Sequence, residues 1–224
     1  WIWRHKTRQN RPPVPDKVAR TAGESLRQKI ERFDDTLLFH LVGSALVPLL
    51  VMIAGLWFIA SLSPAAHTWS LVGLCVILAG VLYGSTWWLI KILGQRRDDA
   101  LNYFGKRVVG DALEGLRAQG YYVFHDVPAH EASPTFCIDH VVVGPTGVFV
   151  METLTRRRGV ARAGLDEHRI VFDGQQIIYP WGEDFVGLNT ARDRGDWLNH
   201  WLVQILGSRV PVLPMLVLPG WWVE

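Results

Sequence analysis

The chain has 224 residues, of which 23 are Lys or Arg, 21 are Asp or Glu and 49% are hydrophobic. The charges are unevenly distributed, because residues 37–90 contain no Asp, Glu, Lys or Arg. This block argues against a wholly soluble globular protein. The near balance of opposite charges argues against a protein that coats nucleic acid through many contacts of Lys and Arg to phosphates.

Two long apolar segments lie within the uncharged block, at residues 37–62 and 69–89. Each is long enough to cross a bilayer, which takes roughly 20 residues of helix. A short uncharged linker with Pro64 joins them, which is typical of a helical hairpin. Basic residues flank the hairpin on both sides, and such flanks stay in the cytoplasm. We therefore expect two spans in the inner membrane, in contact with the lipid bilayer, with both termini in the cytoplasm.

The sequence predicts three parts. They are a basic cytoplasmic segment that contains an amphipathic helix, a two-helix transmembrane hairpin and a cytoplasmic domain, at residues 1–36, 37–93 and 97–224. The amphipathic helix is predicted over residues 16–35, and Thr21 and Glu24 have the spacing of a capping box at its start. The basic face of that helix either contacts anionic lipid or is solvated. Because the chain begins with Trp rather than Met, we expect it to be part of a longer protein. Because the last predicted strand ends only a few residues before residue 224, we expect the domain to be truncated at its C-terminus.

Three glycines lie on nearly one face of the second apolar segment, namely Gly73, Gly80 and Gly84. Small residues at this spacing let another helix approach closely. That helix is either the first segment of the same chain or a helix of another subunit, so self-association and binding to subunits of a membrane complex are both open. The spans carry no Asp, Glu, Lys or Arg that would mark an ion or solute pathway, which argues against a transporter.

The residues after the hairpin have the pattern of an α/β domain. Apolar spacing predicts helices at residues 98–119 and 185–206. Runs of apolar and β-branched residues predict strands at residues 121–125, 136–143, 147–153, 169–172, 176–179 and 210–218. Turn residues at 144–147 and at 173–174 predict two β-hairpins.

Two carboxylates stand inside the apolar strands of the first of these β-hairpins. Asp139 lies within one strand, and Glu152 lies at the end of the next. A carboxylate in apolar surroundings is costly unless it is paired or bound to a cation. A divalent cation is one interpretation, because Mg²⁺ takes one or two carboxylates and completes its shell with water and phosphate. The alternative is that each carboxylate caps its strand or pairs with the arginines at positions 156–158.

The histidines and cysteines give no spacing typical of metal ligands. Cys75 lies within a span and Cys137 lies in the domain, so we expect no disulfide between them. His140 follows Asp139 directly and therefore points to the opposite face of the strand. We interpret His140 as a structural or interfacial residue.

The stretch IDHVVVGPTGVFVMET at residues 138–153 closely resembles the central motif of NERD, the nuclease-related domain, whose fold is of the PD-(D/E)xK restriction-endonuclease-like class. Weaker similarity extends over residues 99–220 and excludes the hairpin. The resemblance implies an α/β fold, with a mixed sheet flanked by helices and preceded by the α-helical transmembrane hairpin. It also implies metal-dependent phosphodiester cleavage, with Asp139 and Glu152 as the catalytic carboxylates that hold Mg²⁺ or Mn²⁺.

The sequence departs from the family pattern at three places. The Glu-x-Lys of the family reads Glu152-Thr153-Leu154, so its lysine is absent. The Gly-Glu of the first helix reads Gly105-Lys106, which replaces an acidic residue with a cation. The Asn-Pro-x-x-Gln of the late helix begins at Asn189 but lacks its Pro and Gln.

Another cation would have to replace the missing lysine. Arg156 shares a face with Glu152 if the strand continues, and we predict it as a third catalytic residue. Lys106 is a second candidate, because it could reach the site from the helix. The basic residues that could hold a DNA or RNA backbone are Arg156, Arg157, Arg158 and Arg162. A solvated turn beside an acidic partner explains these arginines equally well.

Two functions follow from these observations. The first is a membrane-anchored, metal-binding hydrolase that cleaves or engages DNA or RNA at the cytoplasmic face of the membrane. The second is a catalytically degenerate NERD-like domain that acts as a scaffold or assembly subunit of a membrane complex. The sequence therefore leaves open whether the protein is an enzyme.

Overall fold

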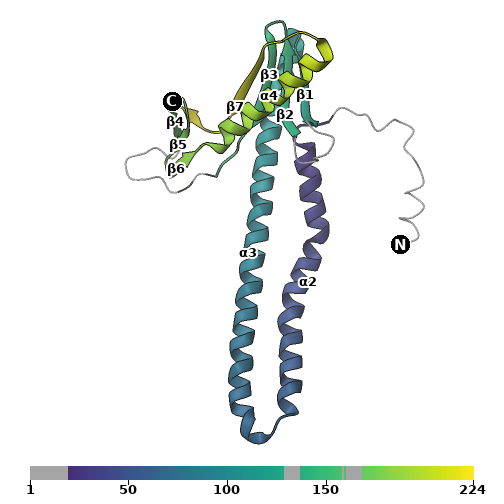
Figure 1. The fold of residues 1–224 in the computed structure, drawn as a ribbon, viewed down its shortest axis with the longest axis vertical. Coiled ribbons are helices and arrows are strands. Elements are labelled where there is room, and N and C mark those ends of the chain that lie inside the picture. The colour runs from purple at the N-terminus through teal and green to yellow at the C-terminus, as the bar shows by residue number, and fades with distance from the viewer. Residues whose placement is uncertain (1–19, 129–136, 158, 160–167) are drawn as a thin grey trace, which may run out of the picture. The chain divides into compact units, whose positions relative to one another are not determined.

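The computed structural model describes residues 20–128, 137–157, 159 and 168–224 (Figure 1). The chain divides into two compact units. The hairpin unit consists of residues 25–105 and 155–158, and the α/β unit contains residues 106–154 and 159–224. Arg158 and Arg162, two of the arginines predicted to bind nucleic acid, lie outside the described residues.

The hairpin unit is built from helix α2 (Glu24–Ala60) and most of helix α3 (His67–Glu114), with a 3₁₀ turn at Pro64–Ala66 between them (Figure 1). Of the residues predicted in the amphipathic helix, 16–19 lie outside the described residues and 20–23 are not helical, since α2 begins at Glu24. The two predicted capping residues do meet at this start, where the Thr21 hydroxyl donates to the Glu24 carboxylate over 2.8 Å. Both apolar segments are helical as predicted.

The structure corrects two predicted boundaries within these helices. The amphipathic helix and the first apolar segment form one helix, and so do the second apolar segment and most of the helix predicted at residues 98–119. The reason is that the polar stretches between them contain no Pro, and a single glycine such as Gly94 does not end a helix. The helical path ends in a 3₁₀ turn, Gly115–Gln119, capped by Gly120 at φ +87°.

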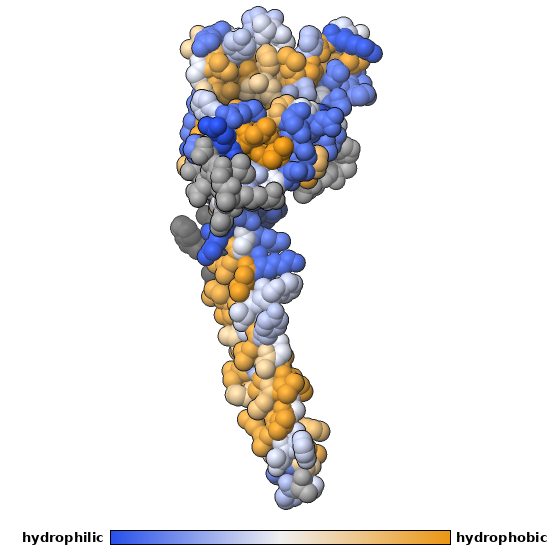
Figure 2. Space-filling view, turned by 90° about the vertical axis from the view of Figure 1, so that its left-hand side faces the viewer, coloured by the Kyte–Doolittle hydropathy of each residue, from blue (hydrophilic) through white to orange (hydrophobic). Residues whose placement is uncertain are grey.

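The apolar side chains of the hairpin unit face outward. Phe39 is 75% exposed and Trp69 is 81% exposed, and Figure 2 shows hydrophobic side chains along the surface of the hairpin. By length and composition, α2 and α3 are two helices that could cross a membrane. Outside a bilayer, so much exposed apolar surface would carry a large hydration cost.

Ion pairs and one close contact hold α2 and α3 together within the hairpin unit. The guanidinium of Arg96 donates two hydrogen bonds to Asp34, over 2.5 and 2.7 Å. A Cβ atom at Gly55 would lie 2.3 Å from a methyl carbon of Leu74, so the two helices approach each other closely at this glycine. Cβ atoms at Gly73, Gly80 and Gly84 would meet no atom within 4 Å among the described residues.

The main sheet of the α/β unit contains four strands, in the order β1-β2-β3-β7. Their bounds are Tyr122–Pro128, Cys137–Gly144, Gly147–Thr153 and Val212–Val217. The first three strands are antiparallel, and β7 pairs parallel to β3. The predicted turn between β2 and β3 is confirmed, with Gly147 at φ +133°. The predicted fold class is confirmed by this mixed sheet, by its flanking helices and by the two apolar helices that precede it.

Helix α4 (Val186–Leu206) packs on β3 and β7. Its buried residues recur every three or four positions, at Gly187, Ala191, Gly195 and Leu198. Leu198 belongs to a core with Ile138, Val141, Val148 and Val150. The backbones approach closely, because a Cβ at Gly195 would lie 3.0 Å from Pro214 of β7. This packing sets the position of the other side chains that α4 presents to the sheet.

A second, smaller sheet has the order β6-β5-β4-β8. Its strands are Gly182–Asp184, Ile177–Tyr179, Arg169–Phe172 and Trp222–Val223. The hairpin predicted around Asp173 and Gly174 is confirmed, since the Asp173 carboxylate accepts two backbone N–H groups and Gly174 has φ +96°. The sequence analysis missed β6 and β8, which have only three and two residues.

Candidate functional site

Asp139 is a fully buried carboxylate in the middle of β2, with 0% of its side chain exposed. Its Oδ1 accepts a hydrogen bond from the Lys106 ammonium group over 2.6 Å, and Arg194 Nη1 lies 3.5 Å from the same oxygen. Its Oδ2 accepts the backbone N–H of Thr153 over 2.9 Å. Both oxygens of Asp139 are therefore satisfied by groups of the chain itself.

Glu152 lies near the end of β3 and pairs with Arg194, whose Nη1 contacts Glu152 Oε2. The side chains of Glu152 and Arg194 are 12% and 14% exposed. Glu152 shares a strand face with Val148 and Val150, which pack against Leu198 of α4. Arg194 precedes Leu198 by one helical turn, so the packing of α4 brings the guanidinium to Glu152.

The four residues Lys106, Asp139, Glu152 and Arg194 form one contact network, hereafter the ionic cluster. It contains two negative and two positive charges, and Arg194 Nη1 contacts both carboxylates. The structure thus brings together the two predicted carboxylates. The cations that contact these carboxylates are Lys106 of α3 and Arg194 of α4. The arginines at positions 156–158 were predicted as one possible set of partners for the carboxylates.

The ionic cluster does not fit a divalent metal ion in the position that the resemblance implies. The carboxylates that would hold Mg²⁺ are occupied by an ammonium and a guanidinium group. Among the described residues, no group of three or more His, Cys, Asp or Glu side chains is arranged to hold a metal ion. A carboxylate removed from water needs an opposite charge, and here the chain supplies that charge.

Arg156, the predicted third catalytic residue, lies beyond the end of β3. Strand β3 ends at Thr153, so the alternation that would place residue 156 on the face of Glu152 does not extend that far. Residues 155–158 belong to the hairpin unit. There, Arg157 pairs with Asp98 over 3.3 Å, and both side chains are more than half exposed.

Leu154 stands where the family motif has its lysine, and it packs against α4. A Cβ placed at Gly187 would lie 2.8 Å from a methyl carbon of Leu154, which shows how closely the two meet. The backbone N–H of Leu154 donates to the carbonyl of Val217 over 3.0 Å. Position 154 therefore contributes apolar packing between β3 and α4.

A second polar network leads from the buried His140 to the half-exposed Glu114 and Arg117. The Nδ1 atoms of His140 and His125 lie 2.9 Å apart, and His125 Nε2 lies 2.9 Å from a carboxylate oxygen of Glu114. Arg117 donates to the other oxygen of Glu114 and to the carbonyl of Val123. This chain of contacts agrees with the structural interpretation of His140.

Burial keeps His140 neutral. Desolvation lowers the pKa of its imidazole from 6.5 to about 4, with smaller opposing and reinforcing contributions from Asp139 and His125. Its Nε2 is buried and has no hydrogen-bond partner among the described residues. A proton on that nitrogen would therefore be a buried, unpaired donor on a charged ring.

The sequence analysis named Lys106 as a candidate for the site but missed Arg194. A signal for Arg194 was present, because it is a cation between Ala191 and Leu198 on the apolar side of the predicted helix. A charged residue that close to an apolar stripe needs a buried partner of opposite charge.

Comparison with known proteins identifies this domain. A family model described as the nuclease-related domain, NERD, matches residues 101–219, which is more than half of the chain. The chain belongs to the NERD family. The match covers the ionic cluster and every strand of the main sheet, whereas α2 lies outside it.

The chain also has similarity to an uncharacterized protein of Bacillus anthracis. The two are 44% identical over 50 residues, which make up 22% of this chain and 24% of that protein. The chain thus spans about a quarter of the length of this relative. No solved structure matches the chain.

Proposed function

We propose that this protein is a membrane-anchored member of the NERD family whose domain acts as a non-catalytic scaffold or assembly module. The observation that carries the proposal is the ionic cluster, in which Lys106 and Arg194 neutralise the two carboxylates that a catalytic metal would need. The exposed apolar surface of α2 and α3 supports the membrane anchor.

The charge balance of the ionic cluster disfavours metal binding. A divalent ion would have to separate Lys106 from Asp139 and Arg194 from Glu152 before it could reach the carboxylate oxygens. Breaking a buried pair typically costs about 3–5 kcal/mol. The displaced cations would then remain near the metal and repel it, since all four side chains are at most 15% exposed.

Metal-dependent phosphodiester cleavage is the second candidate, and one observation favours it. Asp139, Glu152 and Lys106 lie close together in this domain. An aspartate, a glutamate and a lysine are the three residue types of the family motif. In that case Asp139 and Glu152 would hold Mg²⁺ or Mn²⁺, and Lys106 would stand in for the lysine that Leu154 replaces.

A cleavage assay separates the two candidates. The full chain in lipid nanodiscs is incubated with single- and double-stranded DNA and RNA, in Mg²⁺, Mn²⁺ or EDTA. We expect no metal-dependent cleavage. Cutting that requires metal and is lost in a folded Asp139→Asn variant would overturn the scaffold proposal in favour of the nuclease.

A gain-of-binding variant tests the charge argument itself. Lys106→Glu restores the acidic residue of the family pattern and places three carboxylates beside Arg194. We expect this variant to bind Mn²⁺ in calorimetry and to gain thermal stability with added Mn²⁺, whereas the parent does neither. Arg107→Glu is the matched control, because it makes the same charge change at an exposed neighbouring residue.

A groove between the two apolar helices is the surface of the hairpin unit that we propose for contact with a partner helix. This groove of about 480 Å³ between α2 and α3 is lined by the small residues Gly43, Ser44, Gly84 and Ser85 and by the larger residues Phe39, His40, Val47, Val81 and Trp88. Small residues around such a groove permit close contact with another transmembrane helix. The scaffold proposal therefore assigns this groove to a helix of a second copy of the chain.

Native mass spectrometry of the nanodisc-embedded protein tests this contact. We expect a dimer that Gly84→Leu dissociates and that Ala79→Leu leaves intact, because Ala79 is exposed and does not line the groove. A monomeric parent, or equal effects of the two variants, would contradict self-association through this groove.

A further inference from the structure

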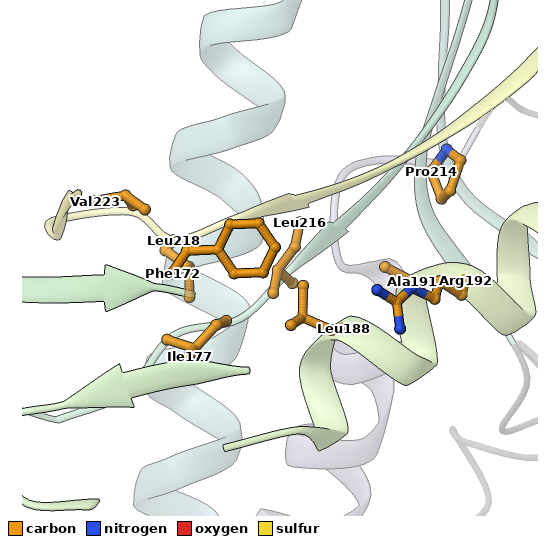
Figure 3. A pocket seen from close by; sticks show the side chains of 9 residues that line it. All are labelled: Phe172, Ile177, Leu188, Ala191, Arg192, Pro214, Leu216, Leu218 and Val223. Atoms are coloured by element: carbon orange, nitrogen blue, oxygen red, sulfur yellow. The ribbon is translucent and has the colours of Figure 1, made fainter. Parts of the chain in front are cut away.

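An apolar cavity of about 330 Å³ lies in the α/β unit between α4, β7 and the small sheet (Figure 3). It is separate from the ionic cluster, since the two share no residue. Its walls consist of the side chains of Phe172, Ile177, Leu188, Ala191, Arg192, Pro214, Leu216, Leu218 and Val223. Small-molecule sites typically have volumes of roughly 300–1,000 Å³ and mostly apolar walls with a few polar groups.

Eight of the nine lining residues are apolar, and several of them are accessible to solvent. Phe172 is 44% exposed and Val223 is 51% exposed. Deeper in the cavity, Ala191 and Ile177 are almost fully buried. The cavity therefore has an apolar floor and an accessible apolar rim, a combination that suits an alkyl chain.

Arg192 is the one charged residue in the wall of the cavity. It is exposed, and among the described parts of the chain no residue pairs with it, although Asp196 lies one turn further along α4. In Figure 3 its guanidinium lies beside Ala191, on the side of the cavity formed by α4. An unpaired guanidinium prefers a carboxylate or phosphate, with which it forms two parallel hydrogen bonds.

We propose that this cavity binds an anionic amphiphile with a single alkyl chain. The chain lies against Leu188, Leu216 and Ile177, and the anionic head pairs with Arg192. A fatty carboxylate and a single-chain phosphate share this chemistry. Binding would add a lipid-sensing property to the NERD domain that is independent of the state of the ionic cluster.

A photoactivatable dodecanoate with a diazirine in its alkyl chain is the direct probe. It is crosslinked to the full chain in nanodiscs, and the modified peptides are mapped by mass spectrometry. Mapping separates the cavity from simple partitioning of the probe into the bilayer. We expect labelled peptides that contain Leu188 and Leu216, and competition by unlabelled dodecanoate or by dodecyl phosphate. Whichever competitor acts at the lower concentration identifies the preferred head.

Variants at the head-group position complete the test. A hydrogen bond to a charged group contributes about 1.5–3 kcal/mol, so Arg192→Gln should weaken competition by dodecanoate at least about tenfold. Arg192→Lys should retain most of the affinity, and Arg209→Gln should have no effect, because Arg209 is an exposed cation outside the cavity. Labels confined to α2 and α3, or equal competition by dodecanol, would overturn the proposal.

Discussion

Removal of the Lys106 ammonium group tests the ionic cluster most directly. In Lys106→Met the aliphatic stem is kept and the charge is lost. Asp139 is fully buried and would retain only the Thr153 N–H and the Arg194 guanidinium, which is 3.5 Å away. Breaking a buried pair typically costs about 3–5 kcal/mol. Because Arg194 remains nearby, we expect a loss at the lower end, about 3 kcal/mol.

A stability change of this size leaves the domain folded in water, since domains typically have about 5–15 kcal/mol of stability. It is measured by urea unfolding of the full chain in nanodiscs, with hydrogen exchange of the peptides that contain β2 and β3 as the local readout. Arg107→Met is the control, because it removes a neighbouring but exposed charge. We expect this control to change the free energy of unfolding by less than about 0.5 kcal/mol.

A rescue experiment separates the loss of the charge pair from general damage. Asp139→Asn in the Lys106→Met background removes the uncompensated carboxylate, so the double variant should recover at least half of the lost stability. The reasoning is refuted if Lys106→Met behaves like Arg107→Met. It is also refuted if the double variant is no more stable than Lys106→Met.

Three further outcomes are expected. His140 is neutral in the folded state, with a pKa near 4, and titrates at 6.5 when unfolded; the unfolded chain therefore takes up the proton first as the pH falls. The contribution of His140 to the free energy of unfolding should be constant above pH 6.5 and should fall by about 3 kcal/mol between pH 6.5 and 4. Urea midpoints should show this pH dependence in the control variant His200→Gln and should lose it in His140→Gln. A Cβ at Gly144 would lie 2.1 Å from the Tyr121 ring, whereas a Cβ at Gly182 would meet nothing within 4 Å among the described residues. Gly144→Ala should therefore lower the free energy of unfolding by about 1–3 kcal/mol, and Gly182→Ala should leave it nearly unchanged in the same urea assay. For the membrane anchor, single cysteines are placed at Gln9 or at Glu224 in a Cys75→Ala, Cys137→Ala background. Both should react with an impermeant maleimide only after the cytoplasmic face is opened. Labelling of one terminus from outside would contradict a two-span hairpin.

The longer strands and the two apolar helices could be predicted because their signals are local. The apolar run of β2, the Gly144–Gly147 turn and the apolar run of β3 specify a β-hairpin within seventeen consecutive residues, and the structure contains it. The short strands β6 and β8 could not be found in the same way. Strand β8 has two residues, and its pairing with β4 depends on the course of the chain through α4 and β7.

The partners of the two carboxylates were the harder part of the prediction. Lys106 is 33 positions from Asp139, and Arg194 is 55 positions from it. Neither distance along the chain suggests contact, and only the packing of α4 on β3 brings Arg194 to Glu152. The local arginines at positions 156–158 were the simpler choice, but β3 ends before it can carry them to the same face.

The parallel pairing of β3 with β7 also has a consequence for the newly made chain. β3 and β7 lie 58 residues apart between their facing ends, so β3 has an open edge until α4 and β7 have left the ribosome. During that interval Glu152 has no Arg194 to neutralise it, and an unpaired strand edge is a site of aggregation. The unneutralised carboxylate works against such association, because a charge on the growing edge must be desolvated before another strand can cover it. The same glutamate therefore adds a charge to the edge strand of the unfinished sheet and pairs with α4 in the finished one.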